Sequence, residues 1–331
     1  MASNEPEGTP LEIDSNDTDS AYSASTRPSS LTSLASEIHR GIFENGRRYH
    51  AYGSAQYAFP NDEPELERLD MQHAMMTLLL DNKLYWAPIG HPQKVLDLGT
   101  GTGIWAIDFA DLHPEADVTG TDLSPIQPHW VPQNCHFEID DAEMEWTFGA
   151  NKFDYIHNRN FVCAIRNWPR LIEQTFHALK PGGWVEWHEK QPKFMSDDDT
   201  LLPDSPLDLW SQYFFEAAEK FNTPADSPSK IKGWMEATGF VDIQQYRLKL
   251  PVGMWPKDQR LKKCGLIEMI NMTEGIEGLS LMCFTRALGW SVEKVQLFLM
   301  EVRKHAKERG VHSYYHFYVI YGRKPEVGSA E

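Results

Sequence analysis

Residues 94–103 have the sequence KVLDLGTGTG, and this stretch decides the fold class. Its first half, 94–98, is a short and mostly apolar run that predicts a buried strand, and a helical pattern follows at 103–112. Glycines at every second position between them let the backbone turn sharply and let a ligand approach it closely. Because open α/β sheets bind ligands at the carboxyl ends of their strands, we predict that this turn is a ligand site.

The rest of the chain alternates between strand patterns and helix patterns. Further strands are predicted at residues 117–121, 135–139, 153–157, 184–189, 240–250 and 312–321, which gives seven with the first. Further helices are predicted at 168–179 and 231–238. Strands separated by helices predict an α/β fold with a seven-stranded, mostly parallel sheet and helices on both faces.

Two helical regions lie outside this alternation. The first is predicted at residues 63–84, where Asp62 is a suitable N-cap and Pro64 suits the first turn. The second is a mostly helical insertion at 251–310, between the last two strands. We expect these two regions to form a lid over the ligand.

The chain is predicted to contain one folded domain, at 37–325, with its ligand-binding core at 94–190. Residues 1–36 are rich in Ser, Thr, Asp, Glu and Pro and poor in large apolar side chains. Such a segment buries too little apolar surface to offset its ordering entropy, so we expect a disordered tail.

Charge and composition exclude several classes of function. The 331-residue chain has a formal net charge of −17, which argues against nucleic acid or an anionic membrane as the main partner. No apolar run reaches the ~18 residues of a membrane helix, and the amino terminus lacks the features of a signal peptide. We expect an intracellular protein, cytoplasmic with the nucleus as the alternative. The four cysteines form no C-x-x-C pair, so neither a metal site nor a disulfide framework is predicted.

Acidic positions extend the pattern of the glycine turn. Asp122 ends the second predicted strand, 19 residues after Gly103, where a carboxylate can accept from both hydroxyls of a ribose. Asp141 follows the third strand and is placed to accept from the amine of adenine, with Asp140 as the alternative. Asp97, two residues before the first glycine, suits the ammonium of an amino acid. S-adenosylmethionine combines an adenosine with an amino acid, so the three positions together favour a methyltransferase.

A nicotinamide dehydrogenase is the competing interpretation. The spacing Gly101-x-Gly103-x-x-Ala106 does match a dinucleotide-binding pattern. In that register Asp97-Leu98-Gly99-Thr100 precede the first glycine of the pattern, which places it too late for the turn, and Asp97 would repel a pyrophosphate. A third interpretation is a glycine loop that binds nothing. The glycine turn, Asp122 and the acids at 140–141 follow three successive strands, and this order favours the methyltransferase.

Longer stretches resemble one family. They are VLDLGTGTGIWAID at 95–108, DLSPIQPHWVP at 122–132, FDYIH at 153–157, LKPGGWVEW at 179–187 and YHAYGSAQYAFPNDEPELERLDMQH at 49–73. Together with a final YGRKP they are similar to the fungal LaeA-like class I methyltransferases, over about residues 38–325. The resemblance implies a Rossmann-like fold, S-adenosylmethionine as cofactor, and a role in fungal secondary metabolism.

The resembled family has two kinds of member, enzymes that methylate small molecules and a nuclear regulator that associates with velvet proteins. This chain departs from the regulator at 140–146, where it has DDAEMEW instead of a Cys-Asp-Phe-Glu-type segment, and at 157–161, which is HNRNF. The departures favour an enzyme with a small-molecule acceptor. A regulator with protein partners is the alternative.

Specific residues follow from these interpretations. We expect the cofactor to be bound by Asp97, Gly99, Thr100, Gly101, Thr102, Gly103, Asp122, Leu123, Asp141, Ala142 and Tyr57. His157, His188 and Glu189 lie at or near predicted strand ends and are the candidate general bases, although each also suits a structural role. Because the sulfonium already activates the methyl group, proximity and alignment can supply much of the rate without a base.

Aromatic and sulfur-containing side chains have two interpretations. Tyr49 precedes the first long helix and is a candidate to cover the methionyl group, or else packs in the core. Trp105, Met75 and Met76 are expected to pack. The eleven Trp, twelve Tyr and sixteen Phe would suit a flat, apolar polyketide, indole or peptide-derived acceptor if some of them line the pocket.

Overall fold

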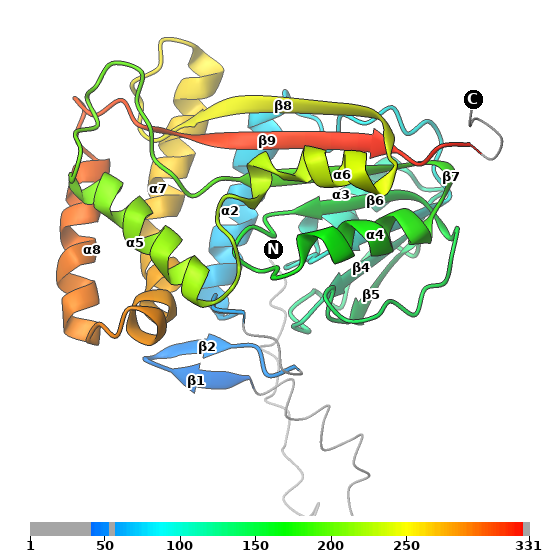
Figure 1. The fold of residues 1–331 in the computed structure, drawn as a ribbon, viewed down its shortest axis with the longest axis horizontal. Helices are drawn as coiled ribbons and strands as arrows, with labels where there is room; N and C mark the ends of the chain where they lie inside the picture. Colours follow the sequence, from blue (N-terminus) through cyan, green and yellow to red (C-terminus); the bar gives the residue numbers. More distant parts are fainter. Residues whose placement is uncertain (1–40, 53–56, 327–331) are drawn as a thin grey trace, which may run out of the picture. The chain divides into compact units, whose positions relative to one another are not determined.

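The computed structural model describes residues 41–52 and 57–326 of the chain (Figure 1). The tail predicted at 1–36 lies outside the described residues. One seven-stranded sheet organises the fold, in the order β5-β4-β3-β6-β7-β9-β8. Its strands are β3 (Lys94–Leu98), β4 (Asp117–Asp122), β5 (Cys135–Ile139), β6 (Phe153–Arg159), β7 (Leu179–Lys190), β8 (Val241–Pro251) and β9 (Tyr314–Arg323). The predicted mostly parallel sheet is confirmed, because β9 alone runs in the direction opposite to the other six strands.

The end of β6 and the start of β7 differ from the prediction. β6 continues two residues beyond the predicted 153–157, because Arg159 still pairs with His188 of β7. It ends where Asn160 adopts a left-handed φ of 61°. β7 begins at Leu179, where the predicted helix was expected to end and a loop to follow up to Gly183, since Leu179 pairs with Phe153 before the register shifts.

Helices cover both faces of the sheet, as predicted. α3 (Ile104–Leu112) covers one face, and α4 (Trp168–Ala178) and α6 (Ile231–Thr238) cover the other (Figure 1). The strand β3 shows why both faces are apolar. Its Val95 packs in the cluster that contains Trp105, while the next residue, Leu96, packs in the cluster that contains Leu171. Successive strand residues point to opposite faces, so a strand buried on both sides is continuously apolar.

The remaining helices pack together beside the sheet. They are α2 (Glu63–Leu79), α5 (Pro206–Lys220), α7 (Gln259–Met282) with a π-helical extension η2 (Cys283–Ala287), and α8 (Val292–Ala306). α2 packs along α7, and α5 packs against η2 and α8, around a third apolar core (Figure 1). The helical insertion expected at 251–310 is therefore present. A short 3₁₀ turn, η1 (Ser227–Ser229), precedes α6.

Three features differ from the sequence prediction. The first long helix ends at Leu79 and not near residue 84, because Asp81 and Asn82 adopt left-handed backbone angles that stop it. A hairpin of β1 (Ile42–Glu44) and β2 (Arg47–Tyr49) was not predicted. The helix α5 was also not predicted, although its apolar residues recur at helical spacing.

Candidate functional site

The glycine turn joins β3 to α3 as predicted, and each glycine has its own physical reason. All three have positive φ, 62° at Gly99, 58° at Gly101 and 81° at Gly103. A Cβ on Gly99 would lie 1.9 Å from the ring of Phe161, and one on Gly103 would lie 2.4 Å from the ring of Phe137. At Gly101 the nearest atom would be 3.6 Å away. Only Gly101 therefore leaves space open for a ligand, while aromatic neighbours exclude side chains at the other two.

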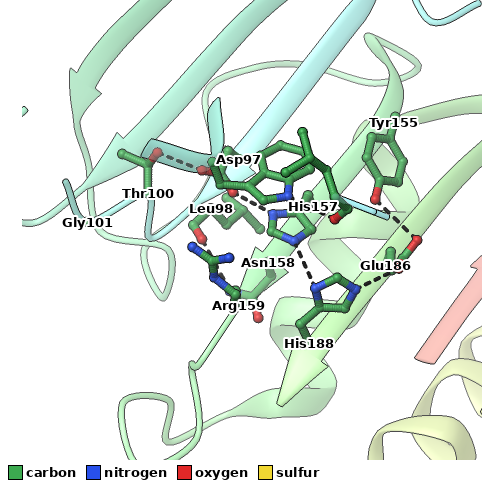
Figure 2. Close-up of polar contacts among 12 residues, drawn as sticks. Asp97, Leu98, Thr100, Gly101, Tyr155, His157, Asn158, Arg159, Glu186 and His188 are labelled. Carbon is green, nitrogen blue, oxygen red and sulfur yellow. Dashed lines mark hydrogen bonds and ion pairs between the residues drawn. The ribbon is translucent and has the colours of Figure 1, made fainter. Parts of the chain in front are cut away.

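Asp97 closes the base of the turn. Its side chain is buried, and its two carboxylate oxygens accept hydrogen bonds from Thr100 Oγ1 at 2.6 Å and from His157 Nδ1 at 2.7 Å (Figure 2). Burial raises the pKa of Asp97 to about 7, although the Thr100 hydrogen bond acts in the opposite direction. Asp97 thus holds the turn in place through internal partners, and any contact with an ammonium group would be additional to these.

Asp122 connects the end of β4 to the glycine turn. Its Oδ2 accepts from the Gly101 N–H at 2.8 Å and its Oδ1 from the Ser124 N–H at 2.9 Å. Burial raises the pKa of Asp122 to about 6, against the effect of these backbone hydrogen bonds. Thr102 Oγ1 donates to Asp70 of α2 at 2.8 Å, so the turn is also tied to the helix above it.

One cavity brings the predicted cofactor residues together. All eleven predicted cofactor positions except Gly103 line it: Asp97, Gly99, Thr100, Gly101, Thr102, Asp122, Leu123, Asp141, Ala142 and Tyr57. Asp140 lines it too, so the choice between the two acids after β5 stays open. The Oδ1 of Asp141 accepts from the Glu143 N–H at 2.9 Å, which fixes its carboxylate. Tyr49 does not belong to the lining residues but packs in the helical core.

His157 lies inside β6, not at its end. It is buried, stacks on Trp105 with ring centroids 3.7 Å apart, and belongs to the cavity lining. Burial, helped by the charges of His188 and Arg159, holds the pKa of His157 well below its usual range. A neutral His157 that donates from Nδ1 to Asp97 has an unprotonated Nε2, and this nitrogen lies 3.5 Å from Nδ1 of His188 (Figure 2).

His188 continues this buried chain to Glu186. His188 Nε2 lies 2.6 Å from Glu186 Oε1 (Figure 2). Burial opposes ionisation of Glu186, but hydrogen bonds from His188 and from the N–H groups of Trp86 and Ala87 outweigh it and lower its pKa. The sequence prediction missed Glu186, whose signal was a carboxylate in the middle of an apolar strand. Nδ1 of His157 thus donates to Asp97, and its Nε2 faces His188 inside the protein, which argues against its use as a base.

The other two base candidates face the interior. Neither His188 nor Glu189 belongs to the described residues that line the cavity. The carboxylate of Glu189 accepts from the N–H groups of Phe161 at 2.9 Å and Val162 at 2.8 Å. Burial raises the pKa of Glu189 to about 8, against those two hydrogen bonds. The carboxylate of Glu189 thus fixes the segment after β6, and the ring of His188 is held by Glu186. We therefore do not propose either residue as a base.

Arg159 was not predicted and is the charged side chain at the carboxyl end of β6. It lines the cavity, and both of its terminal nitrogens lie 3.1 Å from Nδ1 of His73 on α2. Burial lowers the pKa of Arg159 to about 10, so it remains a cation at neutral pH. The signal in the sequence was a basic residue close after a buried strand, which the early strand boundary at residue 157 concealed.

The other end of the cavity is apolar and aromatic. Its lining residues there include Phe59, Val162, Trp210, Phe214, Met272, Leu279 and Tyr315. Trp210 and Phe214 come from α5, which the sequence analysis did not assign, although Leu207, Trp210, Phe214 and Ala217 have the spacing of a helix face. Met272 and Leu279 come from the insertion that was expected to lie over the ligand, so α5 is the helix of this wall that sequence reasoning did not assign.

A buried polar network borders this apolar end and links α2, α7 and β7. Arg68 donates to both oxygens of Glu65, at 2.9 and 2.7 Å, and to Asn271 at 3.3 Å. Asn271 donates to Glu268 at 3.0 Å, and Lys190 pairs with the same carboxylate at 2.7 Å. Since each cation has an acidic partner, the network adds no net charge to the cavity wall.

Comparison with known proteins places the chain in a family. The family model described as a methyltransferase domain matches residues 71–245. "Methyltransferase pytC" of Aspergillus terreus is 42% identical over 299 residues, which cover 90% of this chain and 92% of that protein. "Secondary metabolism regulator LAE1" of Cochliobolus heterostrophus is 36% identical over 290 residues, 86% of this chain and 94% of that protein. The chain belongs to the LaeA-like methyltransferases.

A solved structure is more distantly similar. It is phosphoethanolamine N-methyltransferase 2 of Haemonchus contortus, with a TM-score of 0.46 and 19% identity over 78% of this chain and 52% of that chain. As a LaeA-like methyltransferase, this protein uses S-adenosylmethionine as its methyl donor, which excludes the dehydrogenase interpretation.

The residues present fit this cofactor. Gly101 leaves open space beside a carboxylate at the end of β4, acids lie after β5, and a cation lies at the end of β6. The donor and acceptor types thus match an amino acid, a ribose and an adenine. Among the residues that the structure describes, no cluster of histidines, cysteines and acids could hold a metal ion, and no helix is long and apolar enough to cross a membrane.

Proposed function

We propose that this methyltransferase transfers the methyl group to a small, largely apolar and aromatic acceptor in fungal secondary metabolism. The observation that carries the proposal is the cavity, whose lining joins the residues of the glycine turn to the aromatic side chains of α5 and the apolar side chains of α7. An apolar wall with few fixed polar groups is typical of sites for small organic ligands. Relatives named "Methyltransferase pytC" and "Probable methyltransferase tdiE" support an enzyme.

In this proposal the cofactor is held at the sheet edge. The adenosine is bound by Asp122 at the ribose and by Asp141 or Asp140 at the adenine, while the open space at Gly101 accommodates the methionyl part. When bound, S-adenosylmethionine supplies a methyl group activated by a positively charged sulfur. Leu123 and Ala142 border the same space with apolar surface.

The chain's own contribution to the reaction is orientation and exclusion of water. The side chains of Trp210 and Phe214 stack with ring centroids 4.8 Å apart and give one wall of the acceptor end a flat aromatic surface. Holding an acceptor in line with the methyl group supplies much of a rate enhancement by proximity alone. Because Nδ1 of His157 donates to Asp97 and its Nε2 faces His188 inside the protein, we propose a reaction without a general base, suited to an acceptor whose nucleophilic atom carries no proton at the moment of attack.

The helices α2 and α7 are proposed to form the lid expected from the sequence. Arg68 of α2 and Asn271 of α7 both line the cavity and are joined by a hydrogen bond of 3.3 Å. A lid made from two helices tied by buried polar groups would close as one unit over both ligands. The proposed location is the cytoplasm, with the nucleus as the alternative.

Isothermal titration tests the cofactor assignment first. Purified protein should bind S-adenosylhomocysteine with micromolar affinity and should not bind NAD. Tritiated S-adenosylmethionine then reports transfer to a panel of phenolic, hydroxynaphthoquinone and indole acceptors. A Phe214→Ala variant should raise KM for an acceptor without changing cofactor affinity. Equal effects on both ligands would contradict the placement of the acceptor end.

A regulatory role is the second candidate, because several relatives 35–36% identical are named secondary metabolism regulators. Its distinguishing outcome is cofactor binding without transfer to any small acceptor, together with co-purification of velvet-type proteins. Transfer to a small aromatic acceptor at a rate that saturates with concentration would decide for the enzyme.

A further inference from the structure

Arg159 is placed by the geometry of the sheet on the face that holds the glycine turn. It follows His157 by two residues in β6, so both side chains point to the same face. His157 contacts Asp97 there, and the carboxylates of Asp97, Asp108 and Asp70 all act electrostatically on Arg159. Asp70 in turn accepts a hydrogen bond from Thr102 of the turn. The guanidinium therefore lies beside the glycine turn and α2.

His73 fixes the direction of this guanidinium. Arginine only donates hydrogen bonds, so Nδ1 of His73, which lies 3.1 Å from both terminal nitrogens of Arg159, must be an acceptor. The proton of the ring then lies on Nε2, which donates to Asp108 Oδ2 at 3.0 Å. Burial, followed by the charge of Arg159, lowers the pKa of His73 to about 4 and keeps the ring neutral. Asp108 and His73 thus orient Arg159 without neutralising it.

Arg159 differs from the other arginines of the cavity by its lack of a carboxylate partner. Arg68 is paired with Glu65, and Arg166 is paired with Glu143 at 2.7 Å. Among residues 41–52 and 57–326, no carboxylate oxygen lies within 4.0 Å of the Arg159 nitrogens. Arg159 is half-buried, and a cation that loses part of its hydration is stabilised in proteins by an anion or by hydrogen-bond acceptors. The missing partner is expected to come from a ligand.

We propose that Arg159 binds the α-carboxylate of the methionyl group of S-adenosylmethionine, with His73 and Asp108 as its positioning residues. Two N–H groups of a guanidinium match the two oxygens of a carboxylate. The glycine turn beside it is where the proposed function places the methionyl part, and the inference rests on that placement. An acceptor carboxylate is the other source of the same chemistry, but the aromatic end of the cavity is bordered by cations that already have acidic partners.

The test compares two cofactors by isothermal titration. S-adenosylmethionine and its decarboxylated analogue differ only in the carboxylate, so the ratio of their affinities measures its binding. The wild-type protein should prefer S-adenosylmethionine by about 10- to 100-fold, the range for hydrogen bonds to charged groups. Arg159→Gln should remove most of that preference while it changes the affinity for the analogue by less than about threefold.

Matched variants separate recognition from structure. Arg166→Gln removes a charge from the same cavity but from an arginine that is paired and partly exposed, and it should leave the ratio unchanged. His73→Ala should lower the ratio of the two cofactor affinities in the wild-type background. In the Arg159→Gln background it should have no further effect, as expected for a residue that acts through the arginine. If Arg159→Gln proves unstable, Arg159→Lys keeps the charge without the planar fork and should give an intermediate ratio.

The outcomes distinguish the inference from the proposed function. A wild-type protein that binds neither cofactor would contradict the proposed cofactor site itself. Equal losses for both cofactors in Arg159→Gln, or no loss for either, would overturn the role of Arg159 alone. A raised KM for an acidic acceptor with unchanged cofactor affinities would assign the guanidinium to the acceptor instead, and would also overturn it.

Discussion

The three glycines of the turn should respond differently to the same substitution. Gly99→Ala forces a side chain into a left-handed conformation, which costs about 1–2 kcal/mol, and places its Cβ 1.9 Å from the ring of Phe161. Overpacking of this kind costs about 1–3 kcal/mol more. Gly101→Ala has a similar φ, but its Cβ would have no neighbour closer than 3.6 Å. We therefore expect losses of about 2–5 kcal/mol at Gly99 and about 1–2 kcal/mol at Gly101.

Chemical denaturation measures this difference, and titration with S-adenosylhomocysteine measures its effect on binding. Gly101→Ala should stay folded but bind at least about 10-fold more weakly, because its methyl group projects into the ligand space. In Gly99→Ala, a second substitution, Phe161→Leu, should restore part of the lost stability, since it removes the atoms that the new Cβ meets. Phe161→Leu alone is the control, because it measures the stability that is lost when the ring is removed.

Three results would refute this reasoning. Equal free energies of unfolding for Gly99→Ala and Gly101→Ala would show that backbone conformation, and not the ring of Phe161, decides the cost. If the double variant loses as much free energy of unfolding as the two single variants together, the side chain at 99 and the ring do not interact. Unchanged ligand affinity in Gly101→Ala would remove the methionyl part from the space beside that glycine.

Three further perturbations test the rest of the site. Asp122→Ala should weaken S-adenosylhomocysteine binding by about 10- to 100-fold in titration, and an unchanged affinity would exclude its role at the ribose. The pKa of Glu189 is raised by burial from 4.5 to about 8, so its contribution to folding is fully present below pH 4.5 and is lost as the pH rises through 8. Denaturation curves of Glu189→Gln should show a smaller fall in stability over that window than the wild type, by on the order of a few kcal/mol; parallel profiles would contradict the raised pKa. Arg68→Met leaves Glu65 buried without its cation and should cost about 3–5 kcal/mol, whereas combining it with Glu65→Gln should recover part of that loss in the same assay.

The sequence determined the architecture because local patterns repeat along it. Apolar runs that end in small or acidic residues located β3, β4 and β5 to within a residue, and alternation with helices implied a parallel sheet. The glycine turn and Asp122 could be predicted because backbone freedom and position after a strand are both visible in one dimension. The family resemblance added the methyl donor.

Only the tertiary structure decided which side chains meet in the cavity. The aromatic wall draws Trp210 and Tyr315 from segments about a hundred residues apart, and no local pattern links them. The argument against His157 and Glu189 as bases also depends on the fold, because their hydrogen-bond partners lie on other strands or loops. The role proposed for Arg159 depends on its contact with His73, 86 residues earlier in the chain. Contact between distant segments depends on how helices and strands pack, and that packing is set by the whole folded chain.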